Sequence, residues 1–460
     1  AIAADDWTKN KKAIDVSIKK HERALIKISD EIWHNAELAL EEYKSSKILA
    51  DYAEKNGFSL ERGVAGMPTA FIATYGSGRP RIGILGEFDA NAGISQKAQS
   101  TKEALIEGAP GHGCGHNLYG TGSLGAAIAI KELIAQGKIK GTIVFYGTPA
   151  EETIFGKVWF ARAGLFNDLD VCMDWHPGTD NEASTQSSKA LIDFRVKFSG
   201  KTAHASADPF NGFSAVDGME LFTTGINYYR EHIKPTARIH YQIEKAGDVV
   251  NVVPEKAQIW TRVRENDKEN LDILYERAQK IARAGAMMAE VNYSIELISG
   301  IYEILVNRTG AKILQKNLEL IGPIKYTDEE VEYANTILKA SNKPELGIDG
   351  NINPIKETEP AQGGSTDVGD VSWLVPTAGA RIASWVPGTP GHSWQAVASG
   401  GTSIGLKGEK LAAQVLSDTA IEIYLDPSIA EKAKKELSRR IGKDFIYFPL
   451  LGDRDPPLNY

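Results

Sequence analysis

The stretch Arg81-Ile-Gly-Ile-Leu-Gly86 predicts a buried strand, because it is a short apolar run that ends at a glycine. Thr142-Ile-Val-Phe-Tyr146 and Val171-Cys-Met-Asp-Trp175 predict two further strands for the same reason. Between the first two lies an alanine-rich helical stretch, which we expect to begin near Thr121 or Ser123 with a hydroxyl N-cap. Strands that alternate with helices indicate an α/β sheet layered by helices.

Polar side chains follow each of these predicted strands. Asp89 comes after the first strand, the pair Glu151-Glu152 after the second, and His176 after the third. In α/β sheets the catalytic groups lie at the carboxyl ends of the strands. The sequence therefore predicts that these four side chains meet at one edge of the sheet.

A different pattern begins near Lys189. The segments 190–198, 249–264 and 292–297 alternate like half-exposed strands, and helices are expected near 215–231 and 271–289. Four short strands with two helices indicate a small α+β domain of the ferredoxin-like type, inserted into the first domain. We place the inserted domain at residues 188–306 and the main domain at residues 1–187 and 307–460.

The loop Gly111-His112-Gly113-Cys114-Gly115-His116-Asn117 predicts a metal site. In an extended segment residues two apart point the same way, so Cys114 and His116 can reach one ion, and glycine lets the chain curl around it. Structural zinc sites usually use paired cysteine or histidine clamps, but the chain has only 2 cysteines. The other ligands must then be histidine, aspartate or glutamate, and such mixed sites are more often catalytic than structural.

Further ligands and a base come from three other places. Adjacent carboxylates at Glu151-Glu152 repel each other unless they share a cation or a proton, so one can bind metal while the other is a general base. Taken alone, the pair would be a solvated acidic turn. His176 is either a ligand or a structural histidine, and His392, in a turn after Gly388, is either a ligand or a surface histidine.

Composition narrows the class of protein. The 460 residues are 42% hydrophobic and 24% charged, and the net charge of -8 argues against a nucleic-acid or anionic-membrane partner. No apolar run approaches the roughly 20 residues that cross a bilayer. Ala1-Ile-Ala3 has the small residues that end a secretory signal. The expected compartment is therefore cytoplasmic or, if these residues end a signal peptide, periplasmic.

Together these motifs resemble the di-metal aminoacylase and carboxypeptidase-G-type metallopeptidases, and the resemblance covers nearly the whole chain. It is greatest for the amidohydrolase branch with a His-x-Cys-Gly-His loop, which includes auxin-conjugate hydrolases and aminobenzoyl-glutamate hydrolases. Several spaced motifs occur in the right order. They are Gly66-Met-Pro-Thr69, Gly83-Ile-Leu-Gly-Glu-Phe-Asp-Ala90, the Cys114 loop with Asn117, and Trp385-Val-Pro-Gly-Thr-Pro-Gly-His-Ser-Trp-Gln395.

The resemblance implies a role for each matched residue. The implied ligands of two divalent metal ions, zinc or manganese, are Cys114, His116, Glu152, His176 and His392. Glu151 would be the general base and acid, and Asp89 would orient a ligand. Glu87 replaces the family's first histidine in the His-x-Asp motif, so its contact with metal is left open.

The inserted domain supplies the remaining implied roles. His204 would reach across a dimer into the neighbouring active site and stabilise the oxyanion. Asn251 and Arg264 match substrate-binding positions, and Arg264 could hold a substrate carboxylate with two hydrogen bonds.

The resemblance thus predicts a metal-dependent amidohydrolase that cleaves an N-acyl amino acid, such as p-aminobenzoyl-glutamate or a related conjugate. A dipeptidase or another acyl-amino-acid hydrolase is the first alternative. The second is a partner subunit that needs a homologous chain for activity. The expected assembly is a homodimer, with a heterodimer of homologous subunits as the other possibility.

Overall fold

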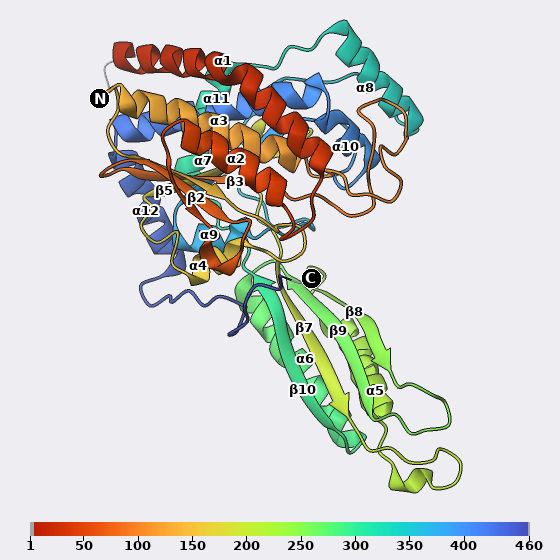
Figure 1. Ribbon diagram of the computed structural model, residues 1–460. Coiled ribbons are helices and arrows are strands. Elements are labelled where there is room, and N and C mark those ends of the chain that lie inside the picture. The colour runs from red at the N-terminus through yellow and green to blue at the C-terminus, as the bar shows by residue number, and fades with distance from the viewer. Residues whose placement is uncertain (1–3, 459–460) are drawn as a thin grey trace.

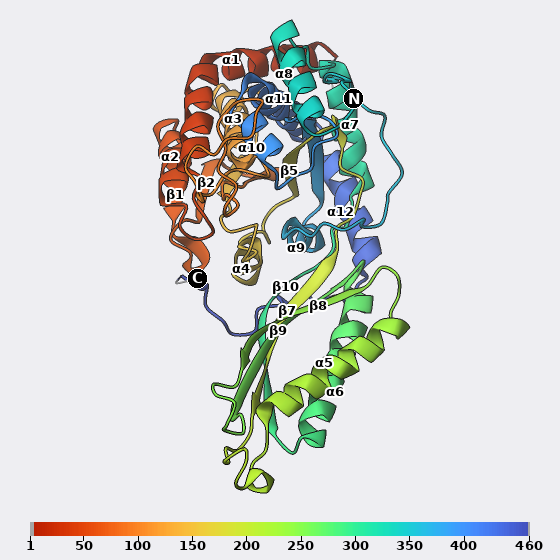
Figure 2. The same cartoon turned by 90° about the vertical axis from the view of Figure 1, so that its right-hand side faces the viewer.

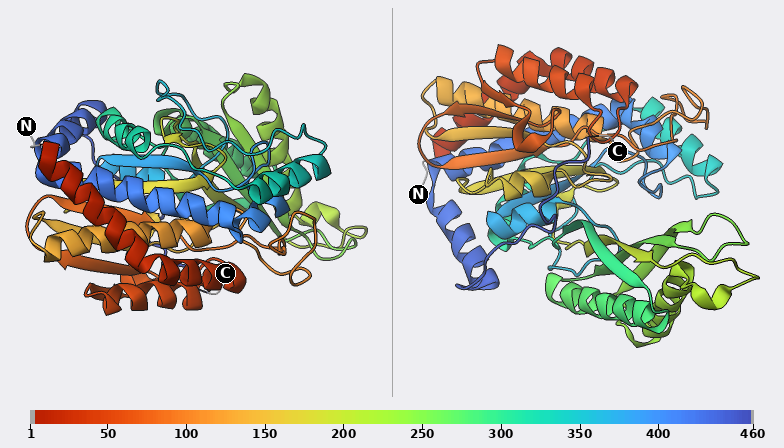
Figure 3. Two further views of the ribbon diagram at one scale, coloured as in Figure 1. Left: turned by 90° about the horizontal axis from the view of Figure 1, so that it is seen from above. Right: turned by 60° about the horizontal axis from the view of Figure 1, so that its bottom comes forward.

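The computed structural model describes residues 4–458. Ala1-Ile-Ala3, which we interpreted as a possible signal-peptide end, lies outside the described residues. A large layered domain carries a smaller domain that projects from one side (Figures 1 and 3). In the described part of the chain, no helix is long and apolar enough to cross a membrane.

The large domain contains a seven-stranded sheet in the order β1-β2-β4-β3-β5-β11-β6. The central strands β4, β3, β5 and β11 are parallel, whereas β2 and β6 join them antiparallel and β1 pairs antiparallel with β2. The strands are β1 (Ser59–Arg62), β2 (Phe71–Gly76), β3 (Arg81–Gly86), β4 (Thr142–Gly147), β5 (Val171–Gly178), β6 (Glu182–Ala183) and β11 (Thr377–Ala383).

Helices cover both faces of this sheet, which makes three layers (Figure 2). Ile84 and Met173 pack in one core with the long helices, while Leu85 and Val144 pack in a second core with α4 and α9. Because both faces are buried, the parallel strands are apolar at nearly every position. The helices are α1 (Ala4–Asn35), α2 (Tyr43–Lys55), α3 (His116–Ala135), α4 (Lys157–Arg162), α7 (Arg308–Ile321), α8 (Asp328–Ala340), α9 (Val368–Leu374), α10 (Trp394–Gly400), α11 (Ser403–Leu425) and α12 (Ser428–Ile441).

The small domain is a four-stranded antiparallel sheet in the order β10-β7-β9-β8, with two helices on one face. Its β-α-β-β-α-β order is that of the ferredoxin-like fold, so the predicted inserted domain is confirmed in type. The limits 188 and 306 stay a prediction. The elements are β7 (Ala190–Ser199), α5 (Ala215–Tyr229), β8 (Arg238–Ala246), β9 (Lys256–Glu265), α6 (Lys268–Met288) and β10 (Asn292–Ile301).

Both connections between the domains lie side by side. The Ser187 hydroxyl donates to the Ile304 carbonyl at 2.7 Å, and the Ile304 amide donates to the Ser188 hydroxyl at 3.1 Å. The carboxyl-terminal segment crosses the same region, because Leu450 is buried in the core of the inserted domain and Leu451 in a core of the large domain. This segment therefore joins the two domains.

Several predicted boundaries were wrong. The helix after the Cys114 loop begins at His116, because Gly115 turns the chain in the left-handed region without any side-chain cap. His176 lies within β5 and does not follow it. The strand predicted from Val249 begins at Lys256, and β8, which is mostly exposed and charged, was not located from the sequence.

Candidate metal centre

The three predicted strand ends do meet, because β3, β4 and β5 are parallel neighbours. Asp89 follows β3, Glu151 and Glu152 follow β4, and His176 lies near the end of β5. His116 enters this edge as the first residue of α3. The candidate centre is thus built from one sheet edge and one helix start, both of them buried in the large domain.

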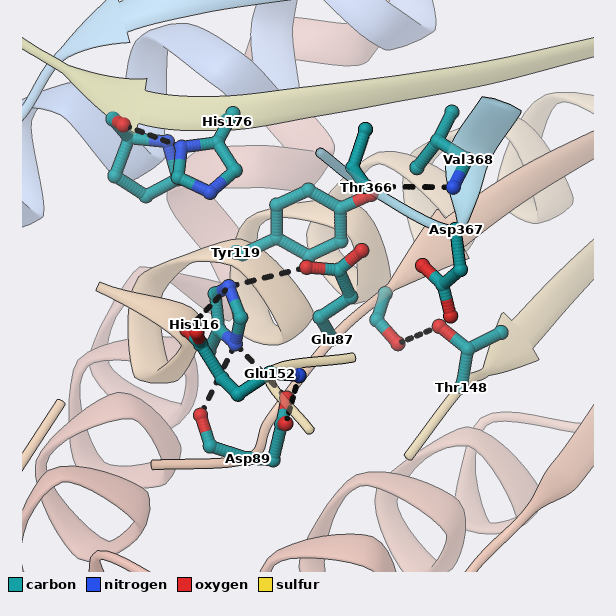
Figure 4. A network of polar contacts seen from close by, with 12 residues as sticks. Glu87, Asp89, His116, Tyr119, Thr148, Glu152, His176, Thr366, Asp367 and Val368 are labelled. Carbon is teal, nitrogen blue, oxygen red and sulfur yellow. Dashed lines mark hydrogen bonds and ion pairs between the residues drawn. The ribbon is translucent and has the colours of Figure 1, made fainter. Parts of the chain in front are cut away.

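His116 is fully buried, and a carboxylate orients it. Its Nδ1 lies 2.9 Å from Oδ1 of Asp89 and 3.0 Å from the Asp89 carbonyl (Figure 4). Its Nε2 lies 3.1 Å from Oε2 of Glu87 and 3.6 Å from Oε1 of Glu152. A carboxylate on one ring nitrogen is the usual support for a histidine whose other nitrogen binds metal.

Three buried atoms at this place lack a hydrogen-bond partner among the described residues 4–458. They are Nε2 of His116, Oε2 of Glu87 and Oε1 of Glu152. Buried polar atoms without a partner are rare, and here they converge on the same space. A cation between them would satisfy all three, so the residues present fit a metal.

The side chains form three groups whose ligand atoms lie within 4.8 Å of one another. The first is Cys114, His116 and His176, and the second is Cys114, Glu152 and His392. Glu87, His116 and Glu151 make the third. Because Cys114 belongs to two groups, the geometry can accommodate two neighbouring ions that share a ligand.

Strained backbone holds these ligands in place. His392 and Ala150 have φ values of 54° and 62°, which are unusual for residues other than glycine. The His392 amide donates to the Gly113 carbonyl at 2.9 Å, and the Ala150 amide donates to Oε1 of Glu42 at 2.9 Å. Such strain concentrates at functional sites, where the surrounding structure maintains it.

Glu151 and Glu152 are adjacent in sequence but differ in electrostatic environment. Burial, together with Glu87 and Glu152, raises the pKa of Glu151 well above its usual range. Burial also acts to raise the pKa of Glu152, but a hydrogen bond with His392 and the charge of His116 outweigh it and lower this pKa to about 2. Environments that separate two carboxylates in this way favour one as a proton carrier and the other as a permanent anion.

The inserted-domain residues lie at two different ends of that domain. His204 and Asn251 are neighbours, since the Ala205 amide donates to the Asn251 carbonyl at 3.0 Å. Their loops, between β7 and α5 and between β8 and β9, form the end that points away from the large domain (Figure 1). Arg264 lies at the opposite end of β9, where its guanidinium donates to the Ser365 hydroxyl of the large domain at 3.0 Å. The structure therefore does not bring His204 or Asn251 to the metal centre of its own chain.

Sequence reasoning missed Lys157 and Asp367. Both are fully buried, and the Lys157 ammonium donates to Glu87 at 2.5 Å and to Asp367 at 2.9 Å. A lysine gives no signal of burial in the sequence, because lysine is almost always exposed. The only available signal was Glu87 at a strand end, which required a buried cation nearby.

Residues 97–340 match the model of peptidase family M20/M25/M40. A further similarity extends over most of the chain, with 35% identity over 450 residues to a p-aminobenzoyl-glutamate hydrolase subunit of Escherichia coli (strain K12), covering 92% of this chain and 94% of that protein. The chain belongs to peptidase family M20/M25/M40. The resemblance inferred from the motifs is thereby confirmed.

Other members of the M20 family extend this comparison. The Xaa-Arg dipeptidase of Homo sapiens is 27% identical over 443 residues, covering 91% of this chain and 89% of that protein. A solved M20 structure from Bacillus subtilis, described as a dinuclear metal-binding peptidase, has a TM-score of 0.60 at 16% identity and covers 88% of this chain and 99% of that one. This M20 chain has the fold and the hydrolase relatives of an amidohydrolase, and it is an enzyme of that class.

Proposed function

We propose that the chain is a metal-dependent hydrolase of N-acyl amino acids whose substrate is p-aminobenzoyl-glutamate or a related aroyl conjugate. The observation that carries this proposal is the meeting of Cys114, His116, Glu152 and His392 beside a buried Glu151 with a raised pKa. The Escherichia coli relative supports the choice of substrate, since it is named as a p-aminobenzoyl-glutamate hydrolase subunit.

Two divalent ions, manganese or zinc, are proposed for the centre. Cys114, His116 and His176 would hold one, and Cys114, Glu152 and His392 the other. Thiolate and imidazole ligands suit zinc, and carboxylates also accept manganese. When bound, such ions acidify water and polarise an amide carbonyl. The Bacillus subtilis structure supports a pair of ions, because it is described as dinuclear.

The chain's own residues supply the proton transfers. Glu151 would take a proton from the attacking water and return it to the leaving nitrogen, which suits a carboxyl with a raised pKa. Asp89 would hold His116 in the orientation that leaves Nε2 free. Glu152, whose pKa is lowered to about 2, would stay ionised as a ligand.

Substrate recognition is assigned to the inserted domain. Arg264 faces the large domain and would bind a substrate carboxylate, as a guanidinium does with paired hydrogen bonds. His204 and Asn251 are proposed to act in the centre of a second subunit, with His204 on the oxyanion. A homodimer is thus proposed. A heterodimer with a homologous chain is the alternative, which the description of the Escherichia coli relative as one subunit of a hydrolase supports.

A dipeptidase is the second candidate function, and the similarity to the human Xaa-Arg dipeptidase favours it. The two candidates share the centre and differ in the leaving amino acid. The discriminating experiment offers the purified, metal-loaded chain matched substrates with acidic, neutral and arginine leaving groups. Faster release of glutamate supports the proposal, and faster release of arginine supports the dipeptidase.

Arg264→Lys sharpens this experiment. The variant should raise KM for p-aminobenzoyl-glutamate with little change in kcat, because lysine cannot form the paired contact. Arg262→Lys is the matched control, since Arg262 lies on the same strand but is paired with Asp193 at 2.6 Å. Equal effects of the two substitutions would remove Arg264 from the substrate site.

A further inference from the structure

Lys157 is the first residue of α4, and its side chain is fully buried. Its ammonium nitrogen lies 2.5 Å from Oε1 of Glu87 and 2.9 Å from Oδ1 of Asp367. No surface ion pair in the described residues has this character, because all three charged side chains here are inaccessible to solvent. A buried charge is retained only when it is paired and hydrogen-bonded.

The two oxygens of Glu87 have different surroundings. Oε1 accepts from Lys157, whereas Oε2 lies 3.1 Å from Nε2 of His116 and has no hydrogen-bond partner within residues 4–458. A carboxylate with one oxygen held in this way cannot rotate to offer both. Glu87 therefore presents a single oxygen to the group that it forms with His116 and Glu151.

Asp367 fixes the lysine from the other side. Its Oδ2 accepts from the backbone amide of Lys157 at 2.9 Å, and its Oδ1 accepts from the ammonium. Asp367 immediately precedes α9, and Figure 4 shows it facing the same space as Glu87. Lys157 is thus held at both its main chain and its side chain, so its ammonium has little freedom to move.

We propose that Lys157 is a positioning residue for the metal centre: it holds one oxygen of Glu87 so that the other faces His116 and the ion bound there. The inference rests on the metal centre of the proposed function. It assigns to Glu87 a contact through one oxygen only, and it gives Lys157 and Asp367 their role through Glu87.

The test is the binding of Co²⁺ alone to metal-free protein, measured by calorimetry and by the absorption spectrum of the bound ion. Lys157→Met should weaken one Co²⁺ site by about 10- to 100-fold, as loss of residues that orient ligands does. It should also change the spectrum of that ion. Lys434→Met is the matched control, because Lys434 forms an ion pair with Asp170 in another part of the domain.

Glu87→Gln should weaken the same Co²⁺ site. The double variant should bind no more weakly than the weaker single variant, because both substitutions act through one oxygen. Additive losses, or unchanged affinity and spectrum in Lys157→Met, would overturn the inference. If wild-type protein binds no Co²⁺, the proposed function itself fails, so the two failures are distinguishable.

Asp367→Asn keeps the experiment decisive if Lys157→Met does not fold. This variant leaves the ammonium and Glu87 in place but removes the anchoring charge, and it should weaken the same site by several-fold. Unchanged Co²⁺ affinity in both Asp367→Asn and Glu87→Gln would overturn the inference.

Discussion

Two adjacent glutamates make the clearest distinction at the scale of single residues. We expect Glu151→Gln to lower turnover by about 10²- to 10⁴-fold while both metal ions stay bound, because the amide cannot accept a proton. Glu152→Gln should instead lose metal. The measurement is metal content and kcat for each purified variant. Near-normal turnover in Glu151→Gln, or loss of its metal, would reassign the base.

Residue chemistry in the sequence was sufficient to find most of the candidate centre. Cys114 and His116 share a glycine-rich loop, and paired carboxylates at a strand end point to metal or proton chemistry, so the structure finds these groups together. Lys157 could not be found in this way. Its burial depends on Glu87 and Asp367, which lie far from it in the chain and meet it only in the folded domain.

Gly115 is the element-scale counterpart of the ligand loop, because it sets the start of α3. Its φ is 67°, and a Cβ would lie 2.9 Å from Cβ of Pro177. Gly115→Ala should cost about 1–3 kcal/mol of stability and weaken metal binding. Gly137→Ala is the control, because Gly137 has a φ of 70° but nothing within 4 Å of a Cβ. The control should lose stability but not metal, as measured by unfolding and metal titration, and metal loss in both would implicate α3 as a whole.

Glu132 links α3 to α1 and gives a pH prediction. Burial acts to raise the pKa of Glu132, but hydrogen bonds from His21, Ser17 and Lys20 outweigh it and lower the pKa to about 2. The folded-state pKa is below the unfolded value of about 4.5, so the contribution to stability is complete above that value and is lost as pH falls toward 2.

Glu132→Gln should therefore lower the free energy of unfolding at neutral pH by about 1 kcal/mol. It should also flatten the fall in stability between roughly pH 5 and pH 3. Urea unfolding across this range measures both effects, with the exposed Glu107→Gln as control. An unchanged pH dependence in Glu132→Gln would show that this carboxylate is not stabilised in the fold.

Secondary elements were predictable where the sequence pattern and the buried environment agree. The three central strands are apolar on both faces, so their positions follow from composition alone. The start of α3 does not, because the turn at Gly115 and not a hydroxyl cap determines it. The edge strand β8 is mostly exposed, so it carries little of the alternation that marks a half-buried strand.

At the scale of the whole molecule, the position of His204 predicts an active site shared between subunits. His204→Ala should lower turnover by about 10²- to 10³-fold, as loss of an oxyanion donor does. Co-expression of His204→Ala with Glu151→Gln should restore part of the activity. A mixed dimer then has one site with Glu151 from one chain and His204 from the other.

Each variant co-expressed with itself is the control for this experiment and should stay inactive. Activity assays on the purified mixed dimer provide the measurement. If mixed dimers form without regaining activity, His204 does not act across the dimer.

The central claim is that this chain alone hydrolyses an aroyl-glutamate with divalent metal. The most direct measurement is release of glutamate from p-aminobenzoyl-glutamate by the purified chain, before and after metal is removed and then returned as Mn²⁺ or Zn²⁺. The account predicts that turnover disappears with the metal and returns with it. Turnover that survives complete metal removal, or none from a fully metal-loaded chain, would contradict it.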